Sequence, residues 1–298
     1  MNREEFAERL PPRRSPRCRR RMGHQLAGGT LTVHSSKFIV ILYLACNLST
    51  ITAKDITEYM MSLRNERQRQ NLMRFFKTGK GEYGEGDEFL GLKVPQTREV
   101  VKHAADLPME EVPALLTNRY HEIRLCGLLI MVSKFERLST KKQLNDETAI
   151  RLRDEIVRLY LRYADNANNW DLVDLSAPKI IGRWLMIPSM LSDKQTVVDS
   201  LAQSNNLWRQ RISMVCTWTT SRMGDPSWCL RYAEMHLHHQ HDLMHKAVGW
   251  MLREMGKQIS MDLLRDFLGC HAHEMPRTTL RYAIEKMPDD ERHYWMNK

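Results

Sequence analysis

The chain has 298 residues, enough for one large domain or two small ones, and its 42% apolar and 27% charged residues are typical of a globular protein. Only 14 glycines and few Val/Ile/Thr runs occur, which argues against a closed α/β domain. The net charge is +9, but residues 1–51 supply +6 of it (nine Lys/Arg against three Glu), so total charge alone does not indicate nucleic-acid binding by the rest.

Six cysteines are scattered along the chain without a C-x-x-C pair. This pattern predicts a reduced intracellular protein. Cys126 and Cys216 lie in apolar runs with helical periodicity, so we expect both to be small side chains of the core.

The first 51 residues combine an Arg/Pro-rich run at 9–21 with an apolar run of nine residues at 38–46. Nine residues are too few for a transmembrane helix, which needs about 20. The basic region is long and no small-x-small cleavage motif follows, so the pattern disfavours an export signal. We predict that residues 1–51 are an extension that is disordered or missing from the mature protein, and that one domain spans residues 52–298, beginning near Thr52.

Residues 55–76 have the periodicity of a single helix. The segment 78–87 (T-G-K-G-E-Y-G-E-G-D) is glycine-rich, but it follows a helix and lacks the G-K-[ST] ending of a phosphate-binding loop. We therefore expect a structured loop. Residues 89–95 then lead into a further helix with Pro95 near its start.

Three later segments resemble one another and are predicted helices: 122–134, 207–217 and 244–253, with 279–286 as one more unit. Trp170 and Trp208 are 38 residues apart, and Arg211 and Trp250 are 39 apart. A repeat of about forty residues is typical of stacked helix pairs of the HEAT type. The fold class we predict is all-α, a right-handed solenoid of HEAT-like antiparallel helix pairs.

Three short motifs place an aromatic and a charged residue on one helix face: Trp170 with Asp174, Trp208 with Arg211, and Trp250 with Lys246. An indole beside a carboxylate suits a cationic ligand or a sugar cation, and arginine suits phosphate oxygens. The alternatives are core packing for the rings, helix capping for the acids, and a salt bridge between repeats for Arg211. Trp208 is assigned to packing.

Residues 235–245 (M-H-L-H-H-Q-H-D-L-M-H) contain five histidines. Zinc needs three or four converging ligands, and the tract lacks a fixed ligand spacing. We predict no metal site there and expect exposed histidines at helix ends. A zinc-dependent hydrolase remains an alternative, and it would retain metal after purification.

Five ordered motifs resemble the AlkD-type DNA alkylation repair glycosylases, a family of HEAT-like proteins. They are F-F-K-T-G-K-G-E-Y-G-E-G-D-E-F-L-G-L-K-V-P (75–95), N-W-D-L-V-D (169–174), L-W-R-Q-R (207–211), H-K-A-V-G-W-M-L-R-E (245–254) and P-R-T-T-L-R-Y-A-I-E-K (276–286). The resemblance covers about residues 52–298. The insertion at 79–86 is longer than in the shortest members of the family.

The resemblance implies a monofunctional glycosylase that hydrolyses the N-glycosidic bond of 3-alkyladenine and 7-alkylguanine in duplex DNA without deep base flipping and without a cofactor. It implies a catalytic Asp174, the paired tryptophans Trp170 and Trp250, and an active-site Arg211. We assign contacts with the DNA backbone to five cationic residues: Arg211, Lys246, Arg209, Lys179 and Lys93. A monomer acting in the cytoplasm near the nucleoid is expected. The rival prediction is a non-catalytic HEAT scaffold that binds DNA or protein.

Overall fold

The computed structural model describes residues 51–191 and 193–298, and Ser49–Lys298 form one compact unit. The Arg/Pro-rich run at 9–21 and the apolar run at 38–46 both lie outside the described residues. Within the described residues the fold is all-α, as predicted, and the only extended pairing is an isolated bridge between Glu88 and Tyr120. None of these helices combines the length and hydropathy that a membrane span requires.

The first part of this unit contains six α-helices and one 3-10 turn. Their bounds are α3 Ala53–Ser62, α4 Glu66–Phe75, α5 Val94–His103, η1 Met109–Glu111, α6 Val112–Leu116, α7 His121–Leu138 and α8 Glu147–Arg162.

The second part contains ten α-helices, most of them short. Their bounds, with the 3-10 turn η2 and the π-helical turn η3, are η2 Ala164–Asn166, α9 Trp170–Ser176, η3 Pro178–Gly182, α10 Arg183–Leu185, α11 Lys194–Ala202, α12 Leu207–Val215, α13 Thr217–Arg222, α14 Ser227–Met235, α15 Asp242–Gln258, α16 Met261–His271, α17 Arg277–Ala283 and α18 Asp289–Asn297.

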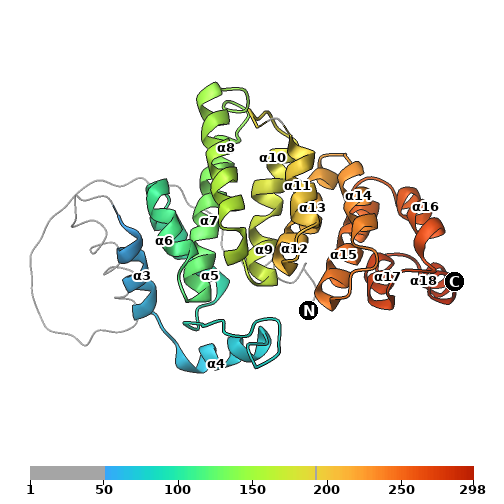
Figure 1. Ribbon diagram of the computed structural model, residues 1–298, viewed down its shortest axis with the longest axis horizontal. Coiled ribbons are helices and arrows are strands. Elements are labelled where there is room, and N and C mark those ends of the chain that lie inside the picture. The colour runs from blue at the N-terminus through green and yellow to red at the C-terminus, as the bar shows by residue number, and fades with distance from the viewer. Residues whose placement is uncertain (1–50, 192) are drawn as a thin grey trace, which may run out of the picture. The chain divides into compact units, whose positions relative to one another are not determined.

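The helices follow one another in chain order from α3 to α18 (Figure 1). Helix α7 packs against α5, α6, α8 and α9, and further along α12 packs against α9, α11 and α15. The most extensive helix contact is between α15 and α17. It depends on Gly249, because a Cβ there would lie 2.3 Å from the carbonyl oxygen of Thr279. Each helix is therefore buried mainly by its neighbours in the chain.

The predicted helix over 55–76 is wrong, because α3 and α4 are separate. Helix α3 begins directly after Thr52, whose side chain caps it and accepts from the backbone N–H of Asp55 at 3.2 Å. The break occurs at Asn65, which caps α4 and whose own N–H donates to the carbonyl of Leu90 at 2.9 Å. Gly91 adopts φ +88°, and a Cβ on it would lie 2.1 Å from the carbonyl oxygen of Asn65. A segment 25 residues further along thus divides the helix.

The other predicted helices are confirmed with small shifts of their ends. Residues 122–134 lie in α7, 207–215 form α12, and 244–253 lie in α15. Pro95 is in the first turn of α5. The last predicted unit ends at Ala283, three residues early. Cys126 and Cys216 are fully buried in the core, as expected.

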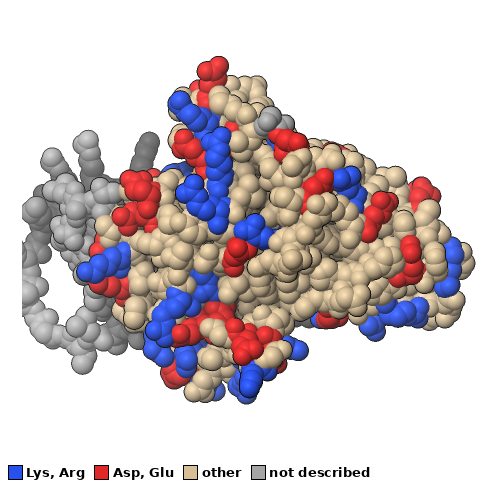
Figure 2. All heavy atoms as spheres, in the orientation of Figure 1, with Lys and Arg blue, Asp and Glu red and all other residues tan. Residues whose placement is uncertain are grey.

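Cationic side chains gather most densely over α8 and around α4 on the face that Figure 2 shows. Helix α8 exposes Arg151, Arg158 and Arg162. Acidic side chains lie among the cations around α4 (Figure 2). On this face the charge is therefore gathered locally rather than spread evenly over the helices.

Candidate active site

The short helix α9 presents Trp170 and Asp174 one turn apart. Asn169 begins the helix, and its side-chain oxygen accepts from the backbone N–H of Trp170 at 2.9 Å. Asp171, the next residue, turns into the core, where 8% of its side chain is exposed. Trp170 and Asp174, one turn apart, both stay partly exposed.

Asp174 forms a bidentate ion pair with Arg211 of α12. The guanidinium donates from Nε to Oδ1 and from Nη2 to Oδ2, both at 2.9 Å, and from Nη1 to the carbonyl of Leu243 at 2.6 Å. Asp174 keeps 16% of its side chain exposed, and Arg211 only 6%. Two parallel hydrogen bonds fix the plane of the carboxylate. The pair therefore holds Asp174 in one orientation with part of it open to solvent.

The surroundings of Asp174 raise the pKa of its carboxyl above the ordinary value of 3.8. Burial is the largest cause, because removal from water disfavours the charged form, and the nearby charge of Asp171 acts in the same direction. Arg211 opposes both through its charge and its hydrogen bonds. A carboxylate in such an environment accepts or stabilises positive charge more strongly than one in water.

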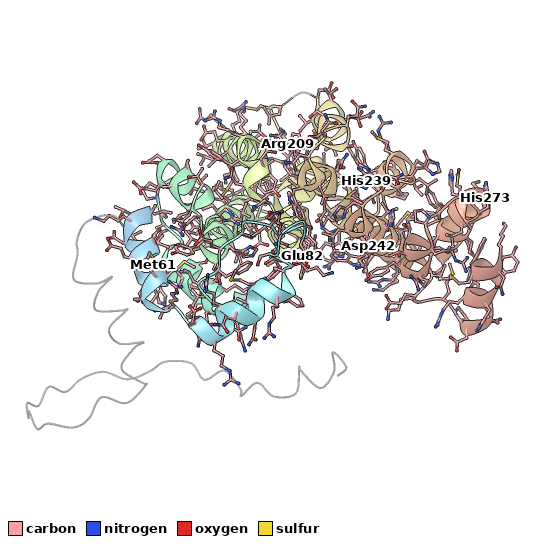
Figure 3. The ribbon with its side chains drawn as sticks, turned by 60° about the horizontal axis from the view of Figure 1, so that its bottom comes forward. Met61, Glu82, Arg209, His239, Asp242 and His273 are labelled. Atoms are coloured by element: carbon pink, nitrogen blue, oxygen red, sulfur yellow. The ribbon has the colours of Figure 1, made fainter. Side chains whose placement is uncertain are left out.

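A cavity of about 530 Å3, here called the polar cavity, lies in front of this ion pair. Its lining includes all four residues predicted to be catalytic: Trp170, Asp174, Arg211 and Trp250. The other lining residues are Phe75, Lys77, Tyr83, His241, Asp242, Leu243, Lys246, Arg253 and Tyr282. In Figure 3, Glu82 of the loop over residues 78–87 and Asp242 of α15 mark two of the segments that meet there.

The aromatic lining of the polar cavity is held by contacts from several elements. The indole of Trp170 meets Phe75 edge-on, with ring centroids 5.9 Å apart, and donates from Nε1 to the hydroxyl of Tyr83 at 3.3 Å. Trp250 follows Gly249, the residue at which α15 and α17 approach most closely. Trp208 is only 8% exposed and packs in the core, as predicted.

Of the five cationic residues predicted to contact DNA, two line the polar cavity and three lie outside it. Arg211 and Lys246 line the polar cavity, where Lys246 pairs with Asp242 at 2.7 Å. Arg209 pairs with Asp165 at 2.5 Å, and Figure 3 places it apart from Glu82 and Asp242. The two remaining residues also lie outside the polar cavity. Lys179 pairs with Glu136 at 3.1 Å. Lys93 lines another cavity, between α4 and α5.

The loop over residues 78–87, here called the glycine-rich loop, is folded into turns, as expected. It starts after Lys77, a non-glycine residue with φ +50°. Gly84 then approaches the end of α4 so closely that a Cβ would lie 2.4 Å from the carbonyl oxygen of Phe76. This folding brings Lys77 and Tyr83 to the polar cavity.

A buried charge network ties the glycine-rich loop to α9. The imidazole of His121 contacts Asp87 at 2.8 Å through Nδ1 and Asp171 at 2.9 Å through Nε2, and Arg124 donates to Asp87 at 2.5 Å. His121 also stacks on Phe89, with ring centroids 4.4 Å apart.

Burial alone would lower the pKa of His121, but the two carboxylates, Asp171 foremost, outweigh it and raise this pKa to about 9. Burial likewise favours a high pKa for Asp87, but His121 and Arg124 bring it below its ordinary value. Both shifts favour the charged forms of His121 and Asp87 at neutral pH.

Another buried carboxylate, that of Glu122, fixes the segment after this loop. Glu122 accepts from the backbone N–H groups of Leu90, Gly91 and Leu92 at 2.8–3.0 Å. Only 2% of this residue is exposed. Three hydrogen bonds from amides replace the water that the carboxylate would otherwise need.

The expectation of exposed histidines in this tract is wrong except for His238, because the other four are buried or half-buried in separate local contacts. His241 caps α15 and lines the polar cavity, whereas His236 is buried against Ser213, and burial lowers its pKa to about 4. His239 bonds Gln210 at 2.8 Å. Among residues 51–191 and 193–298, no group of three or more His, Cys, Asp or Glu side chains is placed to hold a metal ion.

Sequence reasoning missed eight residues that line the polar cavity, and four of them are large side chains of its wall: Phe75, Lys77, Tyr83 and Tyr282. Phe75 is 62% exposed, which is unusual for so large an apolar side chain. Three of the four lie within or just before the glycine-rich segment, and that segment was the available signal.

Comparison with known proteins identifies the family of the chain and a structure of similar fold. The model of a family described as DNA alkylation repair enzyme matches residues 56–287, so the chain belongs to this family. The fold is similar to that of a solved structure described as a predicted DNA alkylation repair enzyme from Enterococcus faecalis. The two share 14% sequence identity with a TM-score of 0.56, over 76% of this chain and 97% of the other. No curated protein matches the chain.

Proposed function

We propose that this protein is a monofunctional DNA glycosylase that releases cationic alkylated purines, 3-alkyladenine and 7-alkylguanine, from duplex DNA. The observation that carries the proposal is the carboxylate of Asp174, oriented by Arg211 and lying with Trp170 and Trp250 on one cavity. We also propose that the all-α fold is a right-handed solenoid of HEAT-like helix pairs. The forty-residue spacing and the packing of α9, α12, α15 and α17 in succession support it.

In this reaction the bond between C1′ of the deoxyribose and N9 of the purine breaks. The electron pair leaves with N9 and neutralises the positive charge that alkylation placed on the base, so the base departs without help from a general acid. The sugar becomes cation-like, and Asp174 stabilises that charge. A water adds its oxygen to C1′, and its proton passes to Asp174 and then to solvent. No metal or nucleotide takes part.

The aromatic residues and cations have separate roles in this scheme. Trp170 and Trp250 lie against the deoxyribose and the cationic base, because an indole face attracts positive charge. Lys246 exchanges its ion pair with Asp242 for an ion pair with a phosphate of the DNA backbone. We had expected Arg211 to hold a phosphate, but three of its N–H groups already donate to Asp174 and to the carbonyl of Leu243. We therefore assign Arg211 to orienting the carboxylate of Asp174.

The base stays outside a deep pocket in this proposal. Phe75 and Tyr282, at 62% and 36% exposure, form part of the wall, as in an open groove rather than an enclosed base pocket. The DNA would therefore be held through its backbone while the lesion remains close to its place in the duplex.

The test is to incubate the full chain with a duplex that carries one 7-methylguanine and to measure two products. A glycosylase releases free 7-methylguanine and leaves an abasic site that breaks only on treatment with alkali. Binding of the duplex without release of base would overturn the proposal and support the non-catalytic scaffold. Metal retained on the purified protein, with release abolished by a chelator, would support the zinc hydrolase.

A further inference from the structure

Two histidines at the start of α15, here called the histidine pair, hold two successive turns of the backbone. The Nδ1 atom of His239 accepts from the backbone N–H of His241 at 3.0 Å, and the Nδ1 atom of His241 accepts from that of Leu243 at 3.1 Å. Each ring thus binds the amide two residues further on, as an asparagine does in an Asx-turn. Figure 3 labels His239 and, in the first turn of α15, Asp242.

Both ends of the histidine pair are attached to α12. The Nε2 atom of His239 donates to the side-chain oxygen of Gln210 at 2.8 Å, and the carbonyl of Leu243 accepts from Arg211 at 2.6 Å. Arg211 in turn binds the carboxylate of Asp174 with two hydrogen bonds. A continuous chain of contacts therefore joins the histidine pair to the carboxylate that we propose is catalytic.

These contacts require both rings to be neutral. An imidazole nitrogen that accepts from a backbone N–H carries no proton, so each ring has its proton on Nε2. The surroundings agree, since the pKa of His239 and that of His241 both lie below the ordinary value of 6.5, with burial as the largest cause.

The charges around the histidine pair also oppose a further proton. The nearest titratable or charged groups are His236, Arg211, Asp242 and His245. Elsewhere on the polar cavity lie Asp174 and the cations Lys77, Lys246 and Arg253. The two carboxylates are each held by a cation, Asp174 by Arg211 and Asp242 by Lys246. The pair therefore loses its hydrogen bonds, and gains no free partner, when it is protonated.

Histidine is an unusual residue for this position. Among the described helices whose N-cap side chain accepts a backbone N–H, α15 alone uses histidine, and the others use Asn, Asp, Ser or Thr. The latter are also the preferred N-cap residues in general. Only histidine has an ordinary pKa between about pH 5 and pH 8. The cap of α15 can therefore be removed by a proton in that range.

We propose that the histidine pair positions Arg211, and through it Asp174, in a manner that makes base release depend on pH. The neutral pair holds the first turn of α15 and the Leu243 carbonyl that binds Arg211. A proton from solvent that binds Nδ1 removes the acceptor, frees this turn and adds positive charge beside a cationic base. Release therefore slows as the pH falls below about 6.5. This inference rests on the proposed glycosylase function.

The experiment measures release of 7-methylguanine from duplex DNA between about pH 8 and about pH 5, a range that brackets the titration of histidine. Protein is in saturating excess, uncatalysed release is subtracted, and each protein is compared with its own rate at the alkaline end. The double variant His239→Asn, His241→Asn keeps oxygens that can accept the same amides but do not titrate here. His238→Asn, at an exposed histidine of the same tract outside the polar cavity, is the matched control.

We expect the rate of wild type and of His238→Asn to fall at least threefold across this range, and the double variant to lose most of that fall. Titration of Asp174 is common to all three proteins and does not produce the difference. A wild-type rate that does not fall, or a double variant that falls as steeply as wild type, overturns the inference and leaves the glycosylase function standing.

If wild type releases no base at any pH, the proposed function itself fails. The state of the histidine pair is then judged without activity, from the imidazole 15N signals of the full chain at neutral pH. Signals of two neutral rings with the proton on Nε2 support the positioning contacts. A proton on Nδ1 of either ring contradicts them, because that nitrogen could not accept a backbone N–H.

Discussion

The polar cavity has one wall built by helices and another built by a loop. Asp174, Arg211 and Trp250 lie on α9, α12 and α15, each fixed by its place on a packed helix. Lys77 and Tyr83 lie in or beside the glycine-rich loop, which is held from behind by buried charges. The helical wall thus carries the proposed chemistry, while the loop wall gives the cavity its shape.

Substitutions in the two walls should therefore differ in how strongly they change the rate of base release and the stability of the fold. On the helical wall an ion pair orients a reacting group, so its loss should lower the rate of base release as well as the stability. Behind the loop wall an ion network holds two segments together, so its loss should affect stability first. Three substitutions test this division, beginning with the largest expected effect.

His121→Ala removes the group between Asp87 and Asp171 and leaves both carboxylates buried without it. Breaking a buried ion network in this way costs about 3–5 kcal/mol of unfolding free energy. Urea denaturation measures this loss. His103→Ala, on the exposed end of α5, is the matched control and should change stability by less than about 0.5 kcal/mol.

The stabilisation by His121 should depend on pH. Its pKa rises from 6.5 to about 9 on folding, so the folded protein binds this proton more tightly than the unfolded chain. The contribution is complete below about pH 6.5 and is lost as the pH rises through about 9. The gap between wild type and His121→Ala should therefore narrow from pH 6.5 to 9.5. A gap that stays constant would show that the imidazole is not charged in the folded protein.

Arg211→Ala and Arg209→Ala compare two arginines two residues apart on α12. Without Arg211 the carboxylate of Asp174 is no longer held in one orientation, so the rate of base release should fall tenfold or more. The free energy of unfolding should fall by about 1.5–3 kcal/mol, the usual contribution of hydrogen bonds to a charged group. Arg209 pairs with Asp165 at the surface, and its loss should cost no more than about 1 kcal/mol. Arg211→Lys keeps the charge but not the fork and should not restore release. Equal effects of the two alanine variants would contradict the division.

Tyr83→Phe is the mildest test, because it deletes only the hydroxyl that accepts from the indole of Trp170. A single neutral hydrogen bond contributes about 0.5–1.5 kcal/mol, so base release should fall by up to about tenfold. Stability should change little. Tyr294→Phe, at an exposed tyrosine of α18, is the control and should leave release unchanged. A large loss of stability in Tyr83→Phe would show that the loop wall depends on this contact.

The helical wall could be predicted from the sequence because its signals are local. Helix periodicity places Trp170 beside Asp174 and Lys246 beside Trp250, and the forty-residue spacing relates the helices to one another. Their convergence on one cavity followed from the family resemblance rather than from spacing alone. A salt bridge between repeats was the alternative given for Arg211, and the structure shows one, but its partner Asp174 was not predicted, since a phosphate and a carboxylate suit the same guanidinium.

The loop wall could not be predicted because its determinants are distant in sequence. The break at Asn65 depends on Leu90 and Gly91, and His121 joins Asp87 to Asp171 across 34 and 50 residues. Glu122 resembled an ordinary charged residue at the front of a helix, but it binds three backbone amides. Periodicity reports which face of a helix is apolar, and it carries no information on such pairings.

The most direct test of the central claim is the rate of 7-methylguanine release by Asp174→Asn against wild type, with binding of the same duplex measured in parallel. The asparagine keeps the shape of the side chain and removes its charge. We predict that binding is retained and that release falls about 10²–10³-fold, the usual loss when a group stabilising transition-state charge is removed. Release at the wild-type rate by this variant would contradict the account.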